Sequence, residues 1–289
     1  MMNNSKTENR RSKSVYAKKS FGQNFLIDRN YIAKIIVALN PQNGETIVEI
    51  GAGRGALTEM LIESGANVTA IELERSMIAV LGERFARKEN FKLIESDALR
   101  IDFSELTGIE NQRPKTKLVA NLPFNISTAI LQKIIEQKDC FSEMVLMFQR
   151  EVVERITAKV GNSERGFLTV MTEAYLTAEK LFDVPPNAFS PAPKVWSSVV
   201  RLMPKIDIEI EDERLFRRIV SAGFRQKRKT IMNNLKSEFG EADKVIGECQ
   251  IDKQRRAETL TLEEWRCLAI EFDFRRRSDG EKAGKPFLC

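Results

Sequence analysis

The sequence predicts an α/β protein with a doubly wound, mostly parallel sheet, followed by a small all-helical domain. Apolar, β-branched runs predict strands at 46–50, 67–71, 91–94, 117–120, 143–148 and 197–202. Segments with helical spacing separate most of them, including 56–63, 76–87 and 128–137. This alternation is typical of parallel strands covered by helices on both faces. The ligands of such sheets bind at the carboxyl ends of the strands.

The same patterns set the expected domain limits. A helix is predicted over 28–39, with Asp28 as its N-cap. Strand alternation ceases beyond 204, and several short amphipathic helices are predicted within 213–274. We therefore expect four parts: a basic flexible arm at 1–19, a ligand-binding α/β domain at 20–205, a helical domain at 206–277 and a flexible tail at 278–289.

Composition excludes several classes of protein. The 289 residues are 42% hydrophobic, enough for a core, and no apolar run is long enough to span a membrane. Histidine is absent, which removes Ser-His and Cys-His mechanisms and leaves a zinc site almost no ligands. The cysteines lack C-x-x-C spacing, so we interpret all four as reduced thiols in a cytosol: Cys140, Cys249, Cys267 and Cys289. We expect a cytoplasmic protein with no metal.

Positive charge is concentrated in two places. The net charge is +5, and segment 1–19 accounts for it with six cations and one acid. A second cluster without acids consists of Arg225, Lys227, Arg228, Lys229 and Lys236. Clustered bases favour a polyanionic partner, although either cluster alone is also consistent with a solvated surface.

The stretch "VEIGAGRGAL" places glycines between a predicted strand and a predicted helix. Gly51 and Gly53 allow the backbone to approach a ligand closely, and Glu72, after the next strand, is spaced to bind a ribose. With Ala56 the loop also satisfies the dinucleotide fingerprint. Asp97, after the third strand, can accept from an adenine amino group, which favours S-adenosylmethionine over a dinucleotide. Asp97 is equally consistent with simple capping.

The stretch "NLPF" ends the strand predicted at 117–120. The side-chain oxygen of Asn121 and a backbone carbonyl near Leu122 or Pro123 can accept both N–H bonds of an exocyclic amino group, and Phe124 can stack on its base. Two such acceptors would stabilise the positive charge that develops on the nitrogen as a methyl group leaves a sulfonium. This chemistry needs no histidine. Taken alone, the motif is also consistent with a turn and a core phenylalanine.

The order of these motifs resembles that of S-adenosylmethionine-dependent amino-methyltransferases. From about Lys18 to Ala269 the chain resembles the ribosomal RNA small-subunit adenine N6,N6-dimethyltransferases (KsgA type). The motifs that carry the resemblance are "KKSFGQNFLID", "VEIGAGRGALTEML", "AIELE", "SDAL", "VANLPFNIST", "MFQREVVERI", "FSPAPKVWSSVVRL", "FRQKRKTIMNNL" and "RAETLTLEEW". The resemblance implies a Rossmann-like class I methyltransferase that dimethylates two adjacent adenines in the 3'-terminal hairpin loop of small-subunit (16S) rRNA, late in subunit assembly.

Residue roles follow from the resemblance. It places the methyl donor against Asn24, Leu26, Gly51, Gly53, Glu72, Asp97 and Asn121. It makes Asn121, Pro123 and Phe124 the target-adenine pocket. Phe189 would cover the base from the other side, or else anchor a loop between prolines. A basic helix carrying Arg225, Lys227, Arg228 and Lys229 would contact RNA together with the arm. The implied partner is small-subunit rRNA or a pre-30S particle. We expect a monomer that does not bind a membrane.

Two positions depart from the family pattern. The chain has Arg165-Gly166-Phe167-Leu168 where Tyr-Gly-Arg-Leu is expected, and Trp196 where the family often has an acid. Both leave the catalytic motifs intact and concern RNA contacts. Three alternatives remain: a large-subunit rRNA methyltransferase of the macrolide-resistance type, a non-catalytic rRNA-binding assembly factor, and a nicotinamide dehydrogenase. "MFQREVVERI" and "FRQKRKTIMNNL" favour the small-subunit enzyme over the first.

Overall fold

The computed structural model describes residues 24–107, 109–110, 113–114 and 116–283, so the predicted arm lies outside the described residues. At its centre is a seven-stranded sheet of order β4-β3-β2-β7-β8-β11-β9. Its strands are β2 (Thr46–Ile50), β3 (Asn67–Glu72), β4 (Phe91–Glu95), β7 (Lys117–Asn121), β8 (Glu143–Gln149), β9 (Leu176–Val184) and β11 (Ser197–Pro204). The neighbouring strands β4, β3, β2, β7 and β8 pair in parallel, and the β8–β11 and β11–β9 pairs are antiparallel. The predicted α/β class is confirmed.

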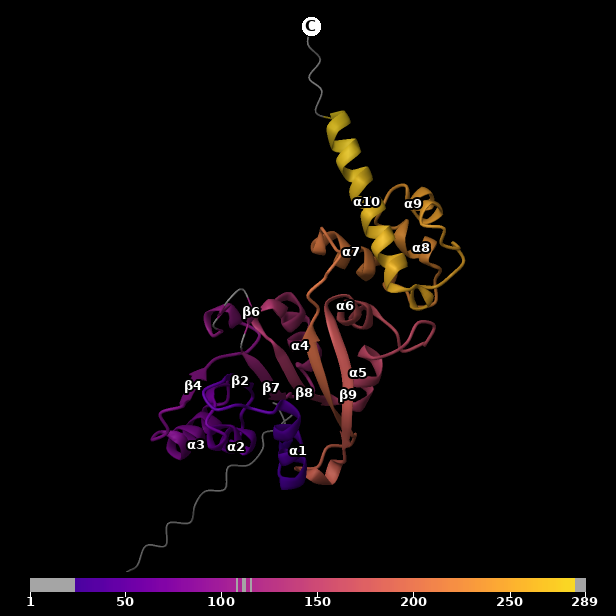
Figure 1. The fold of residues 1–289 in the computed structure, drawn as a ribbon. Helices are drawn as coiled ribbons and strands as arrows, with labels where there is room; N and C mark the ends of the chain where they lie inside the picture. The colour runs from indigo at the N-terminus through magenta and orange to yellow at the C-terminus, as the bar shows by residue number, and fades with distance from the viewer. Residues whose placement is uncertain (1–23, 108, 111–112, 115, 284–289) are drawn as a thin grey trace, which may run out of the picture.

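Helices cover both faces of this sheet (Figure 1). One face packs against α1 (Arg29–Leu39), α2 (Ala56–Glu63) and α3 (Arg75–Phe85). The other packs against α4 (Ser127–Glu136), α5 (Arg150–Ile156) and α6 (Phe167–Tyr175). Successive side chains of a strand point to opposite faces. Accordingly Ile47 belongs to the first core and its neighbour Val48 to the second, both fully buried.

Caps and glycines explain where the first helices begin. Asp28 caps α1 as predicted, accepting from the Asn30 amide at 2.8 Å. Helix α2 begins after Gly55, whose φ is +79°. A Cβ at Gly55 would lie 2.6 Å from the ring of Phe85, so glycine is required both by conformation and by space.

The sequence did not reveal the edge strand β9. Its charged residues, among them Glu179, Lys180 and Asp183, obscure the alternation expected of a strand. The pairing with β11 also shifts register between Val199 and Val200, which interrupts the alternation of side chains between the two faces.

Short strands complete the fold: β1 (Phe25–Leu26) with β10 (Phe189–Ser190), and β5 (Ile109–Glu110) with β6 (Arg113–Pro114).

The C-terminal part is helical, as predicted. Its helices are α7 (Glu213–Gly223), α8 (Ile231–Leu235), α9 (Ala242–Glu248) and α10 (Leu262–Ala283). They gather at one end of the molecule near α6 (Figure 1). The core continues from the sheet into them, because Tyr175 of α6 packs edge-on against Phe216 of α7 with ring centroids 6.2 Å apart. Trp265 is fully buried, and a Cβ at Gly223 would overlap its ring.

Two expectations about this helical part need correction. The basic segment predicted as a helix is a turn, because α7 ends at Gly223 and α8 restarts only after Thr230, whose hydroxyl accepts from the Asn233 amide. The side chain of Asn234 fixes the turn by donating to the Gly223 carbonyl at 2.6 Å. The predicted tail at 278–289 is helical as far as Ala283, and the rest lies outside the described residues. No described helix is both long and apolar enough to cross a membrane.

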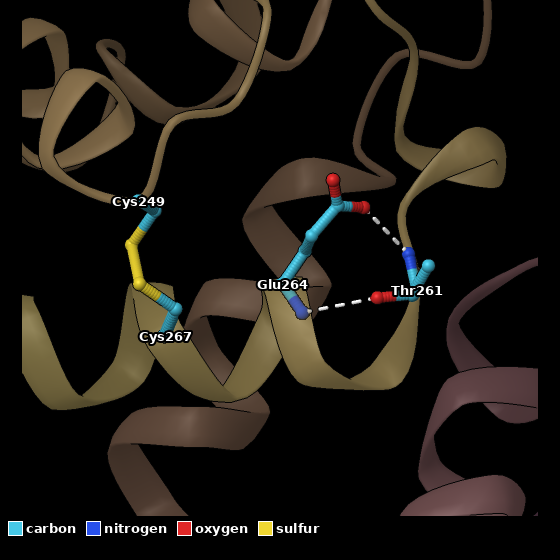
Figure 2. Close-up of a disulfide and its surroundings, with 4 residues drawn as sticks. All are labelled: Cys249, Thr261, Glu264 and Cys267. Atoms are coloured by element: carbon cyan, nitrogen blue, oxygen red, sulfur yellow. Dashed lines mark hydrogen bonds between the residues drawn. A yellow bond between two sulfur atoms is a disulfide. The ribbon is translucent and has the colours of Figure 1, made fainter.

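The interpretation of all cysteines as free thiols was wrong for two of them. Cys249, at the end of α9, and Cys267, on α10, form a disulfide with a Cα–Cα distance of 5.8 Å (Figure 2). They lie 18 positions apart in the sequence, and only the packing of α9 on α10 brings them together. Close by, Thr261 and Glu264 cap α10 reciprocally: each backbone amide donates to the other residue's side chain (Figure 2). Cys140 is buried and free.

Candidate active site

The glycine loop lies where β2 ends. Gly51 and Gly53 have φ values of +71° and +55°, which explains the choice of glycine. The Gly51 amide donates to the carbonyl of Ile71 at 2.8 Å, which ties the loop to β3. A Cβ at Gly51 would lie 3.9 Å from the Asn121 carbonyl and from the Pro123 ring. The loop thus faces the end of β7 closely.

Glu72 ends β3 and is held by backbone amides. Its Oε2 accepts from Gly53 at 2.9 Å, and its Oε1 accepts from Leu73 at 2.9 Å and from Glu74 at 3.0 Å. The residue is only 8% exposed, yet it lines the cavity described below. A carboxylate has about four acceptor positions, so this one can still accept from a ligand hydroxyl.

The segment Asn121 to Phe124 forms a rigid turn beyond β7. The Leu122 amide donates to the Met147 carbonyl at 3.3 Å, and the Pro123 carbonyl accepts from the Ile126 amide at 3.2 Å. The side-chain amide of Asn121 donates to the Asn24 carbonyl at 3.3 Å. That bond fixes the orientation in which the Asn121 Oδ1 remains available as an acceptor.

The short strand β1 lies next to the glycine loop. Leu26 is 5% exposed and pairs with Phe189 of β10. A Cβ at Gly53 would lie 3.1 Å from the ring of Phe25, and the Arg54 guanidinium lies 4.4 Å from the centre of that ring. Sequence reasoning named Asn24 and Leu26 but missed Phe25, whose only signal was its position between them.

Most of the predicted residues meet at one cavity of about 70 Å³. It is lined by Asn24, Gly51, Gly53, Glu72, Asn121, Pro123 and Phe124, together with Phe25 and Leu122. Leu26 lines a larger neighbouring cavity of about 710 Å³, which shares Phe25, Gly51, Gly53 and Asn121. The carboxyl ends of β2, β3 and β7 therefore bring together Glu72, the glycines and the "NLPF" turn.

The larger cavity also contains an acid that sequence reasoning missed. Glu49 on β2 is 2% exposed and accepts from the Thr58 hydroxyl at 2.6 Å. Burial raises the pKa of this carboxyl to about 7, the nearby charge of Glu72 adds to the rise, and hydrogen bonds from Thr58 oppose it. Its signal was an acid inside an otherwise apolar strand directly before the glycine loop.

Two predicted residues lie apart from this group. Asp97 follows β4, where its Oδ1 accepts from the Leu99 amide at 3.0 Å and its Oδ2 lies 4.0 Å from Arg100 Nε. Asp97 thus caps a turn and is not among the residues lining either cavity. Phe189 is 4% exposed and packs in the core on the α1 side of the sheet. This placement matches the loop-anchor alternative, and covering a base would require the ring to leave the core.

The predicted RNA-binding cations lie in the exposed turn between α7 and α8. We call residues 225–229 the basic loop. Arg225 pairs with Glu238 at 2.5 Å. The other three cations are exposed and have no acidic partner within 4.0 Å among the described residues: Lys227, Arg228 and Lys229. Among those residues, no cluster of three or more Cys, Asp or Glu side chains is placed to hold a metal ion.

Comparisons with known proteins identify the family to which this chain belongs. Residues 15–273 match the ribosomal RNA adenine dimethylase family. A ribosomal RNA small subunit methyltransferase A from Aromatoleum aromaticum is 43% identical over 252 residues, 86% of this chain and 91% of its own length. The protein of the same name from Lactococcus lactis is 39% identical over 260 residues, 87% of this chain and 88% of its own length.

Solved structures agree with these relatives. A dimethyladenosine transferase from Plasmodium falciparum superposes with a TM-score of 0.74 at 25% identity, covering 87% of this chain and 98% of its own. The 23S rRNA methyltransferase ErmE superposes with a TM-score of 0.65 at 22% identity, covering 86% of this chain and all of its own, which shows the shared fold.

The sheet order, the glycine loop and the strand-end acid define a class I methyltransferase. Within that class the match over 15–273 is decisive. The chain belongs to the ribosomal RNA adenine dimethylase family, and its enzyme class is therefore rRNA adenine dimethyltransferase.

Proposed function

We propose that this protein transfers methyl groups from S-adenosylmethionine to N6 of two adjacent adenines in the 3'-terminal hairpin loop of small-subunit (16S) rRNA. One observation carries the proposal: the glycine loop, Glu72 and the Asn121–Phe124 turn line a single cavity at the ends of neighbouring strands. The names of the relatives at about 40% identity support the small subunit as the source of the RNA.

The residues of the cavity fit a methyl donor that carries a ribose. The Glu72 carboxylate would accept from the ribose hydroxyls. Gly51 and Gly53, which their positive φ requires, would present no side chain to the donor. When bound, the donor supplies an electrophilic methyl group on a sulfonium. Asp97 would accept from the donor's adenine through its partly exposed carboxylate.

The turn after β7 fits the target adenine. The Asn121 Oδ1 is the first acceptor for the amino group. Since the Pro123 carbonyl already accepts from Ile126, the Leu122 carbonyl is favoured as the second. Both acceptors are fixed before the base arrives, so they stabilise the positive charge on N6 without reorganisation. Phe124, which lines the same cavity, would stack on the flipped base.

The wider setting is also part of the proposal. The basic loop supplies three exposed cations for phosphate contacts, and the predicted arm adds more positive charge to the chain. We place the reaction in the cytoplasm, on rRNA within a pre-30S particle bound by one copy of the protein.

Replacing Asn121 tests the proposal, with Asn125 as the matched control because it is exposed in the same loop. With labelled donor and undermethylated small subunits, we expect Asn121→Ala to lower kcat by about 100-fold or more while RNA affinity stays within a few fold. Asn125→Ala should retain wild-type turnover. Equal turnover in Asn121→Ala would refute the pocket assignment.

The same assay separates the alternatives. Labelling of purified large-subunit rRNA only would identify an enzyme of the macrolide-resistance type. Wild-type protein that binds subunits without labelling them would be an assembly factor, and NAD binding without S-adenosylmethionine binding would identify a dehydrogenase.

A further inference from the structure

Trp196 is an unusual residue to leave on a surface. Of the two tryptophans in the chain, Trp265 is fully buried, whereas Trp196 is 44% exposed. Its neighbour Val195 is 40% exposed. Tryptophan is enriched at interaction interfaces relative to the rest of a protein's surface.

The backbone around Trp196 is held firmly. Its carbonyl accepts from the Arg150 amide at 2.9 Å, and the next residue, Ser197, pairs with Gln149 of β8. Pro191 and Pro193 restrict the loop that precedes it. The indole is therefore presented from a rigid position, which lowers the entropy lost when it binds a partner.

Strand register places Trp196 on the same edge of the sheet as the active site. Asn121 ends β7 beside Met147 of β8, and β11 begins, antiparallel, opposite the last residue of β8. Across the sheet, Trp196 thus lies two strand spacings from Asn121, or about 10 Å. Along the strand direction it lies three residues further, or about another 10 Å. A few nucleotides of single-stranded RNA can span that separation.

We infer that Trp196 is a stacking platform for an unpaired nucleotide that flanks the target adenine in the RNA substrate. Unpaired bases of RNA are recognised largely by stacking on aromatic side chains. Lys194, two residues earlier, is exposed and has no acidic partner within 4.0 Å in the described part of the chain, so it is available to the adjoining phosphate. The inference rests on the proposed function and adds a second base-binding position to it.

Kinetics with undermethylated small subunits test the inference. Trp196→Ala should raise KM for the subunits by about 5- to 100-fold, the usual effect of losing one base stack, and leave kcat at saturation within about twofold. Trp196→Phe, which keeps a ring, should recover most of the loss. Ile206→Ala is the control, because Ile206 is 84% exposed and lies beyond the opposite end of β11.

Tryptophan emission gives an independent measurement. Since Trp265 is buried, the emission that solvent quenchers reach comes from Trp196. Adding protein-free small-subunit rRNA should quench that emission, and Trp196→Phe should abolish the effect. An unchanged KM for Trp196→Ala would overturn the inference. A raised KM without quenching by protein-free rRNA would also overturn it, because the partner would then be a protein of the particle.

These outcomes are distinct from failure of the proposed function. If wild-type protein methylates small subunits and Trp196→Ala matches it, only the stacking platform is refuted. If wild-type protein methylates no RNA, the proposed function itself fails.

Discussion

Glu49 provides a sharp test of the site's electrostatics. Its carboxyl is 2% exposed within β2, and burial raises its pKa from 4.5 to about 7. The difference between these two pKa values corresponds to about 3 kcal/mol of folding free energy. Replacement by glutamine keeps the shape and an acceptor for the Thr58 hydroxyl but removes the charge.

The direction of the pH effect follows from proton binding. Between pH 4.5 and 7 the folded protein holds a proton on Glu49 that the unfolded chain releases. The contribution of Glu49 to stability is therefore fully present below pH 4.5 and is lost as pH rises through about 7. In the Glu49→Gln variant this side chain does not titrate, so this pH-dependent loss of stability does not occur. Relative to wild type, the variant should gain about 3 kcal/mol of stability between pH 4.5 and pH 8.

Denaturant unfolding of both proteins at pH 5 and pH 8 measures this gain. Most of the change falls within that window, so about 2 to 3 kcal/mol should appear. Glu63→Gln removes an exposed carboxylate from the neighbouring helix α2 and controls for loss of charge alone. A difference between Glu49→Gln and wild type that is equal at both pH values would refute a buried carboxyl with a raised pKa.

Two further predictions concern the helical part. Gly223→Ala should destabilise the protein by about 1 to 3 kcal/mol in thermal unfolding, because the added Cβ meets the buried Trp265 ring, whereas Gly247→Ala on α9 has open space and should not. A normal melting temperature for Gly223→Ala would contradict that packing. Neutralising the three exposed cations of the basic loop should reduce the dependence of RNA affinity on salt, and an unchanged slope would make the loop an ordinary solvated surface.

Sequence reasoning succeeded where local chemistry decides structure. Buried parallel strands are continuous apolar runs, and a helix cap such as Asp28 needs only its immediate neighbours. The proximity of Gly51, Glu72 and Asn121 was predicted because parallel strands bring their carboxyl ends to one edge, so order along the chain predicts proximity.

It failed where distant packing decides. The charges of β9 are tolerated because it lies at the edge of the sheet, and nothing local reveals that. The disulfide depends on how α9 meets α10. Glu49 was visible as an acid within an apolar strand, but the depth of its burial, which raises its pKa, depends on the packing around the strand.

The departure at Arg165 also has a structural explanation. Its side chain is 1% exposed and pairs with Glu173 at 2.6 Å. It also donates to the Leu260 carbonyl at 3.4 Å, just ahead of α10. The side chain of Arg165 thus helps join the two parts of the protein.

The core that runs from the sheet into the C-terminal helices restricts how this protein can be divided. A chain cut at 205 would uncover Tyr175 where Phe216 now covers it, and would leave the charges of Lys138 and Arg165, both nearly buried, without Glu213 and the Leu260 carbonyl. The part before 205 would then expose an apolar ring and two charges that have each lost a partner. The boundary near 205 therefore separates two architectures that share one continuous core, and we expect the part before it to be less stable alone than within the whole chain.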